Sequence, residues 1–214
     1  MNKPSKPPRA PGRPTAAVTA QRELLLDAAT DLFASQGIQA TSLRAIAERG
    51  GVTPALLNYY FGGKDGLVEA MVEERFLPLV VDAAAALQQA GDDPHELVAA
   101  FVRHMSRNVA AHPWISQLWV REILCEGGVL RERLMDRVAP LVPLLLAQKF
   151  AAAQARGALN PQLDPRLLVV SLIGVTLLPH AAAPLWRGVF ANPQIGDDAL
   201  IAHTLALLKG AMEP

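Results

Sequence analysis

Side chains that can hydrogen-bond to DNA gather on one short stretch near the N-terminus. Between residues 53 and 64 the chain carries a threonine, an asparagine, two tyrosines and a lysine. Asparagine can bond the edge of an adenine in the major groove, whereas threonine, tyrosine and lysine can hold phosphate oxygens. This set of residue types therefore indicates recognition of a nucleic acid.

Two short helices joined by a glycine turn are expected to position these side chains. The segment 41–67 reads TSLRAIAERGGVTPALLNYYFGGKDGL. Apolar residues recur at helical spacing over 42–49, and Gly50-Gly51 then ends the first helix. Thr53-Pro54 restarts the chain with a capping hydroxyl followed by a proline at the first helical position. This arrangement is typical of a helix-turn-helix.

A longer helix is expected in front of this pair. Its apolar residues repeat on one face, at Leu25, Ala28, Ala29, Leu32 and Phe33. We expect Thr19 to cap its start and Gly37 to end it. Residues 19–66 therefore form the predicted three-helix DNA-binding head.

This head resembles the DNA-binding head of the TetR family of regulators. The resemblance extends from about Gln21 to Phe76 and is carried by LLDAATDLFASQG, TSLRAIAERGGV and LNYYFGGKDGL. The contacts that it implies at the edge of the site and to the phosphate backbone come from Thr41 or Ser42, Arg44, Tyr59, Tyr60 and Lys64. The contacts that it implies to bases come from Thr53, Pro54, Ala55 and Asn58.

Three of these positions have an alternative. The family usually has a tyrosine where this chain has Asn58, and in place of the phosphate contact expected from that tyrosine an asparagine could reach an adenine edge. Thr53 could serve only as a helix cap, and Tyr60 could pack in the core beside Phe61.

Composition favours an all-α protein with a helical body behind the head. About half of the 214 residues are apolar, and alanine and leucine dominate. Periodicity and breaks predict further helices at 64–91, 94–111, 114–125, 129–156, 166–182 and 197–210, about nine in all, with a kink at Pro78 and a loop or short turn over 184–196. Residues 67–214 are therefore expected to form an effector-binding and dimerisation domain.

The N-terminal segment 1–18 is predicted to be a flexible basic arm, because it is rich in proline and positive charge. Residues 1–66 carry eight Lys and Arg against five Asp and Glu, whereas the remainder carries twelve against fifteen. A basic head on an acidic body is typical of a nucleic-acid binder. Arg13 could enter a narrow minor groove, or the arm could be an incidental charged tail.

Other function classes find little support in the sequence. Cys125 is the single cysteine, so no disulfide within the chain is possible, and no run of apolar residues is long enough to span a membrane. We find no phosphate-binding loop, nucleophile elbow or metal-ligand spacing. The expectation is a cytoplasmic protein that is not an enzyme and has no metal or cofactor.

A homodimer is expected, because one head contacts too few bases for useful specificity. Two heads would read the half-sites of a palindromic operator in double-stranded DNA. The resemblance implies that the last two long helices join the subunits, and the candidates are Leu167, Val170, Ser171, Gly174, Val175, Leu178, Leu200, Thr204 and Leu207. These faces could instead pack within one subunit.

An effector pocket is expected between the helices of the body. The candidate lining residues are Phe101, His104, Met105, Trp114, Gln117, Trp119 and Cys125, although several could instead be core. We expect a small, mostly apolar ligand that releases a repressor from its operator. The alternative is an accessory interaction protein whose helix-turn-helix head no longer binds DNA.

Overall fold

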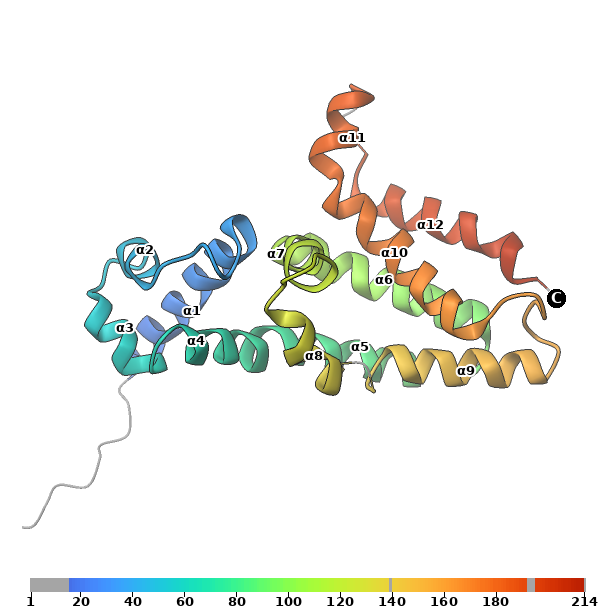
Figure 1. The fold of residues 1–214 in the computed structure, drawn as a ribbon. Helices are drawn as coiled ribbons and strands as arrows, with labels where there is room; N and C mark the ends of the chain where they lie inside the picture. Colours follow the sequence, from blue (N-terminus) through green and yellow to red (C-terminus); the bar gives the residue numbers. More distant parts are fainter. Residues whose placement is uncertain (1–15, 139, 192–194, 214) are drawn as a thin grey trace, which may run out of the picture.

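The computed structural model describes residues 16–138, 140–191 and 195–213, and all regular structure in these ranges is helical. The expected all-α architecture, with a helix-turn-helix head and a helical body, is confirmed. Figure 1 shows the head at one end of the molecule and the body at the other. The head helices are α1 (Ala16–Gln36), α2 (Leu43–Arg49), α3 (Pro54–Phe61) and α4 (Lys64–Met71). The predicted arm falls largely on residues 1–15, outside the described residues.

One continuous helical rod connects the head to the body (Figure 1). It consists of α4, the π-helical turn η1 (Val72–Phe76) and α5 (Leu77–Gln89). The backbone N–H of Leu77 bonds to the carbonyl of Val72, five residues back, and Pro78 follows with no N–H to donate. The irregularity expected at Pro78 is therefore a π-helical turn placed directly before the proline.

The body consists of seven further α-helices and a second π-helical turn. They are α6 (Pro94–Ala111), α7 (Trp114–Leu118), η2 (Trp119–Leu124), α8 (Leu130–Val138), α9 (Pro143–Ala155), α10 (Pro165–Ala181), α11 (Ala183–Val189) and α12 (Asp197–Met212). An Asp-Pro pair starts two of these helices, because Asp93 and Asp164 accept hydrogen bonds from backbone N–H groups of the first turn.

Three sequence predictions about the helices are wrong. The helix expected over 129–156 is divided into α8, which ends at Val138, and α9, which begins at Pro143. Proline has no N–H to continue the hydrogen bonds of a preceding helix, and it is favoured in the first turn of a new one. The loop or short turn expected over 184–196 contains α11, so the described residues hold eleven helical rods instead of nine. Thr19 caps nothing, since α1 already begins at Ala16.

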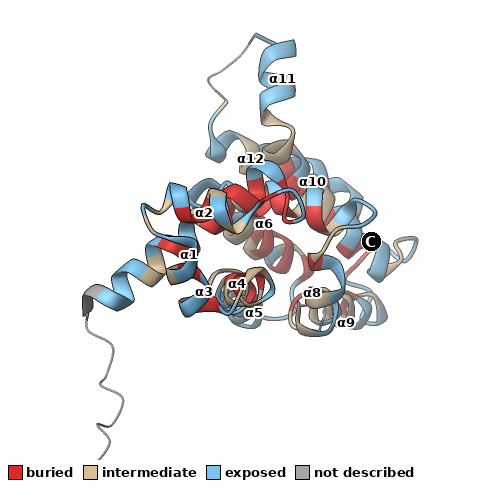
Figure 2. Ribbon diagram, turned by 60° about the vertical axis from the view of Figure 1, so that its left-hand side comes forward, coloured by how far each residue is buried: buried red, intermediate tan, exposed pale blue. Residues whose placement is uncertain are grey.

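The hydrophobic core of the head continues into the body. Fully buried head residues such as Phe33, Ile46 and Leu57 share one cluster with Leu118 of α7 and Leu130 of α8. A second cluster lies among α5, α6, α9, α10 and α12. Figure 2 shows buried stretches of α6 and α10 facing the interior, whereas α11 stands out from the body and is largely exposed.

Ion pairs fasten α1 to the π-helical turn of the connecting rod. The Arg22 guanidinium donates two hydrogen bonds of 2.6 Å to the Glu74 carboxylate. Arg75, the next residue, bonds to Glu23 and Asp27 of α1. The hydrogen bonds from Arg22 hold the pKa of Glu74 below its ordinary value.

No single helix in the described part of the chain is long and apolar enough to cross a membrane. Two bent pairs, α8 with α9 and α10 with α11, reach that length and composition only when their two helices are taken together.

Candidate nucleic-acid interface and body cavity

Side-chain caps and a tight glycine turn build the helix-turn-helix. The Ser42 hydroxyl accepts from Ala45 N–H at 3.1 Å and caps α2, and the Thr53 hydroxyl accepts from Leu56 N–H at 3.3 Å and caps α3. Gly51 has a φ of +65°, which favours glycine, as expected for the turn. A Cβ on Gly50 would lie 2.3 Å from Leu25 Cδ2, so this turn also packs closely against α1.

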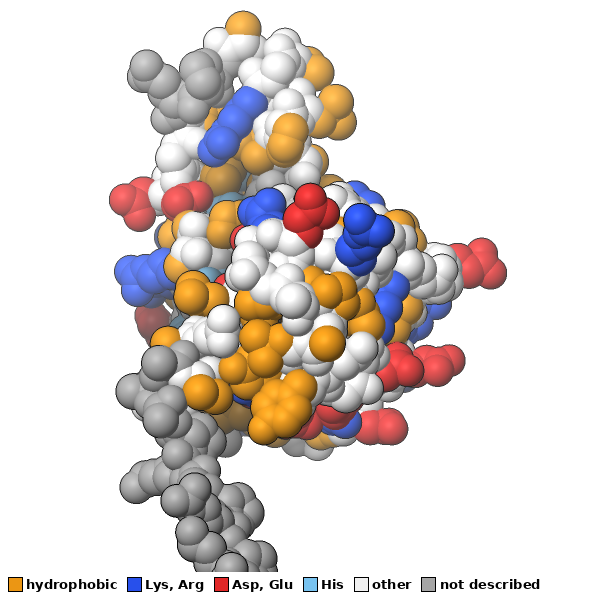
Figure 3. Space-filling model, turned by 90° about the vertical axis from the view of Figure 1, so that its left-hand side faces the viewer, with side chains coloured by type: hydrophobic (Ala, Val, Ile, Leu, Met, Phe, Trp, Pro, Cys, Tyr) orange, Lys and Arg blue, Asp and Glu red, His pale blue; other side chains and the backbone are white. Residues whose placement is uncertain are grey.

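Helix α3 turns one face inward and one face outward. Leu57 and Phe61 are buried in the head core, whereas Asn58 is exposed and Tyr59 is 81% exposed. The structure brings the predicted base-facing residues together on the outward face, and they are Thr53, Pro54, Ala55 and Asn58. In the view onto this end of the molecule, hydrophobic and uncharged side chains occupy the centre, and acidic side chains lie mostly toward the edges (Figure 3).

Of the two hydroxyl residues before α2, only Ser42 faces solvent. Ser42 and Arg44 are exposed beside the outward face of α3. Thr41 is 1% exposed, and its hydroxyl donates to the carbonyl of Gly37 at 2.7 Å. The predicted contact from Thr41 is therefore wrong, because this side chain closes the turn between α1 and α2.

Tyr60 and Lys64 lie at the margin of this surface and already have partners. The Tyr60 hydroxyl donates to Gln21 Oε1 at 3.2 Å, while its ring packs against the head core. Lys64 Nζ donates to the carbonyl of Gln39 at 2.8 Å. To bind a DNA phosphate, either side chain would have to give up the hydrogen bond that it makes here.

The fold and this surface define a helix-turn-helix protein with a helical body. Residues 25–71 match the model of the family described as bacterial regulatory proteins, tetR family. The match assigns the head of this chain, over residues 25–71, to the tetR type of DNA-binding head.

Relatives and solved structures extend the likeness beyond the head. The HTH-type transcriptional regulator BetI of Brucella canis is 39% identical over 82 residues, which cover 38% of this chain and 41% of that protein. The chain thus spans about two fifths of that relative's length. The A-factor receptor protein of Streptomyces griseus is 24% identical over 193 residues, 84% of this chain and 65% of that protein. The ketosteroid transcriptional regulator KstR2 of Mycobacterium tuberculosis has a TM-score of 0.74 at 18% identity over 91% of this chain and 95% of that one, so it shares the fold.

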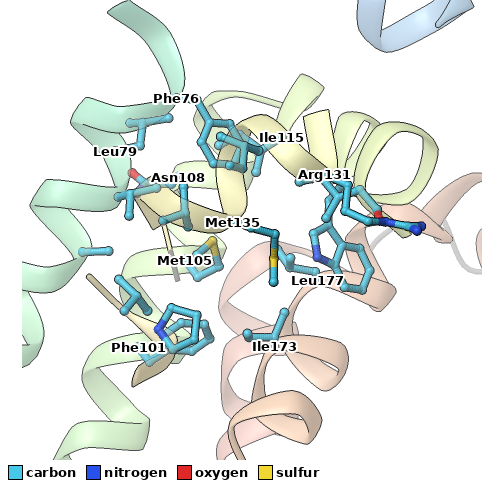
Figure 4. Close-up of a pocket in the computed structure, with 18 residues that line it drawn as sticks. Phe76, Leu79, Phe101, Met105, Asn108, Ile115, Arg131, Met135, Ile173 and Leu177 are labelled. Atoms are coloured by element: carbon cyan, nitrogen blue, oxygen red, sulfur yellow. The ribbon is translucent and has the colours of Figure 1, made fainter. Parts of the chain in front are cut away.

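The body contains an apolar cavity of about 220 Å³ (Figure 4). Of the predicted lining residues, Phe101, Met105 and Trp119 surround it. Asn108 and Arg131 are the polar residues of the lining. The Arg131 guanidinium turns away from the centre of the cavity and donates to the carbonyls of Ile123, Leu124 and Cys125.

Four predicted lining residues lie elsewhere. Gln117 and Cys125 are exposed, because they fall on the outer side of α7 and after the end of η2. Trp114 packs against Phe76, with ring centroids 6.3 Å apart, and His104 lies 3.8 Å from an Asp82 oxygen. The sequence analysis missed the lining residues of α8 and α10, which include Leu134, Met135, Ile173 and Leu177.

The predicted dimer residues are mostly uncovered in the single chain. Leu167, Val170, Leu178 and Leu207 are each more than half exposed, and Ser171 is exposed beside them. Gly174, Val175 and Leu200 are half-buried, and a Cβ on Gly174 would meet nothing within 4 Å. Thr204 is buried within the subunit, so its assignment to a dimer contact is wrong. Exposed apolar residues of α11 that the sequence analysis missed are Leu185 and Val189.

Proposed function

We propose that this protein is a sequence-specific DNA-binding transcription regulator that acts as a ligand-released repressor. The observation that carries the proposal is the outward face of α3, where Asn58 and Tyr59 stand exposed on a helix capped by Thr53. A helix presented in this way fits the major groove, and its amide and hydroxyl groups can bond base edges and phosphates. The match of residues 25–71 to a family of bacterial regulatory proteins supports the same function.

Two copies of the chain are proposed to bind a palindromic operator. The exposed apolar face of α10, around Leu167, Val170 and Leu178, runs beside exposed residues of α12 such as Leu207. Covering these faces with a second copy would remove a large apolar surface from water. A symmetric pair would present two copies of α3 to two half-sites.

The effector is proposed to be a small, mostly apolar molecule. The cavity is lined by aromatic and aliphatic side chains such as Phe101 and Trp119, and the Asn108 amide can give the ligand one directed hydrogen bond. A ligand shifts DNA binding only if it binds more tightly to one conformation of the body than to the other. If the cavity is larger in a conformation that moves the two heads apart, the ligand would favour that conformation. The dimer would then leave the operator.

Selection of genomic fragments by the purified full chain tests this function. We expect recovery of a few discrete sites that share an inverted repeat, with one dimer bound at each site. Binding that shows no preference for any duplex sequence at moderate salt would contradict it.

A second candidate is an accessory protein that pairs with another protein through its head. The observation in its favour is that the outward face of α3, from Thr53 to Tyr59, contains no lysine or arginine. Fragment selection separates the two, because an accessory protein would enrich no duplex sequence.

A further inference from the structure

Glu122 is a buried carboxylate at the junction between head and body. It is only 4% exposed. Its Oε1 accepts from the backbone N–H of Ile38 at 2.8 Å, and its Oε2 accepts from the backbone N–H of Val129 at 3.0 Å. Ile38 lies in the turn between α1 and α2, and Val129 directly precedes α8. One side chain therefore fastens a segment of the head to a segment of the body.

The backbone around this carboxylate fits it closely. Gly37 has a φ of +92°, and a Cβ there would lie 3.4 Å from Glu122 Oε1. A Cβ on Gly128 would lie 2.2 Å from the carbonyl oxygen of Glu122. Because both segments approach as bare glycine backbone, the carboxylate has little freedom to move unless they move with it.

The head segment held by Glu122 leads directly into α2. Thr41 closes the same turn through its bond to the Gly37 carbonyl, and Lys64 bonds to the Gln39 carbonyl. Ser42, the next residue, is the N-cap of α2. Since α3 packs on α2 through residues such as Leu57 and Ile46, a shift of this turn would displace the outward face of α3.

On the body side, the same π-helical turn forms part of the cavity wall. Trp119 and Ile123 of η2 line the cavity, and Glu122 lies between them in sequence. The segment beginning at Val129 leads into α8, which contributes Leu134 and Met135 to the lining. An occupant of the cavity would thus press on both of the body elements to which Glu122 is bound.

We propose that Glu122 is a positioning residue that couples the cavity to the DNA-binding head through the turn at residues 37–41. The rod formed by α4, η1 and α5 also reaches the cavity, at Phe76 and Leu79, and it offers a separate route. The assignment is specific to the carboxylate, because only a side chain with two acceptor oxygens satisfies both amides. For its effect on DNA the proposal rests on the function proposed above.

Amide hydrogen exchange in the full chain tests the two hydrogen bonds without any DNA. In Glu122→Gln the side-chain NH₂ must face one of the two backbone donors, so exchange at Ile38 or Val129 should accelerate by about tenfold or more. Glu126→Gln, an exposed neighbour, is the matched control and should leave both rates unchanged. Unchanged rates in Glu122→Gln would overturn the proposal. If that variant does not fold, Glu122→Asp replaces it, and full protection of both amides there would equally overturn the proposal.

Coupling is tested by a double-mutant cycle on an operator recovered with the wild-type chain. Met135→Trp places a large ring at a lining position of the cavity that is largely exposed. If Glu122 carries the signal, the change in operator affinity caused by Met135→Trp should disappear in the Glu122→Gln background. Equal effects in the two backgrounds to within about twofold, including no effect in either, would overturn the coupling. A wild-type chain that selects no operator contradicts the proposed function instead, and the amide rates then still decide the role of Glu122.

Discussion

At the scale of single residues, α3 carries two sets of side chains: one packs in the core of the head, and the other faces solvent. Leu57 and Phe61 are buried, whereas Asn58 and Tyr59 project outward from the same two turns. No hydrogen bond holds the side chain of Asn58 or Tyr59 to another described residue, so substitution of these two should change recognition with little effect on folding.

Replacing Asn58 with alanine should relax sequence preference at one base pair in each half-site. A side-chain amide that bonds an adenine edge contributes about 1–3 kcal/mol of discrimination against a wrong base. The measurement is selection from a library of randomised duplexes, with Glu48→Ala on the exposed side of α2 as the control. A selected motif identical to that of the wild-type chain would show that Asn58 reads no base.

At the scale of elements, short helices depend on their caps. Helix α2 has seven residues, and its first turn relies on the hydroxyl of Ser42. Helix α1 is longer and draws further stability from its ion pairs to η1. These two features give predictions for stability that are independent of DNA.

Replacing Ser42 with alanine should lower the free energy of unfolding by about 0.5–2 kcal/mol, since a backbone N–H of α2 loses its acceptor. Urea denaturation of the full chain measures the difference. Ser35→Ala is the control, because the Ser35 hydroxyl donates to the carbonyls of Asp31 and Leu32 within α1 and caps no helix. An equal loss in both variants would argue against the cap.

The pairing of Glu74 with Arg22 should make stability depend on acidity. Because the folded state lowers the pKa of Glu74, its stabilising contribution is present above the pKa of the unfolded chain and is lost as the pH falls through the folded value. The free energy of unfolding should therefore decrease as the pH falls below about 4.3, the ordinary pKa of a glutamate side chain. In Glu74→Gln this decrease should be smaller than in the control Glu132→Gln, whose residue is exposed on α8. Parallel pH profiles would contradict the assignment.

The sequence predicted elements well wherever capping and breaking signals agree. Asp93-Pro94 and Asp164-Pro165 mark the starts of α6 and α10, and Gly37 marks the end of α1. It failed between 129 and 156, where apolar periodicity suggested one helix although Pro143 starts another. The same error hid the lining residues of α8, since a cavity wall depends on how helices pack and not on periodicity along one of them.

At the scale of the whole molecule, the exposed apolar face of α10 indicates where a second copy would pack. Gly174 lies within it, and a Cβ there would meet nothing within 4 Å inside the subunit. A loss of dimers on placing a large residue at this position would therefore point to a contact with another chain.

Replacing Gly174 with arginine should therefore convert dimers to monomers without unfolding the chain, because a buried charge without a partner is costly at an interface. Light scattering gives the mass, and far-UV circular dichroism checks the fold. Ala151→Arg on the exposed side of α9 is the control. Dimers that survive Gly174→Arg would place the subunit contact elsewhere.

The head shares one apolar cluster with α7 and α8, and this limits how the head can be transferred to another protein. Cutting the chain after α4 would remove Leu118 and Leu130 from the cluster that contains Phe33. The side of α1 that they cover would then be exposed to solvent. A hybrid that grafts this head onto a foreign body should stay folded only if the donor brings its own counterparts to these two leucines. The packing unit of the head therefore includes residues of α7 and α8, so no single cut in the chain separates a complete head from a complete body.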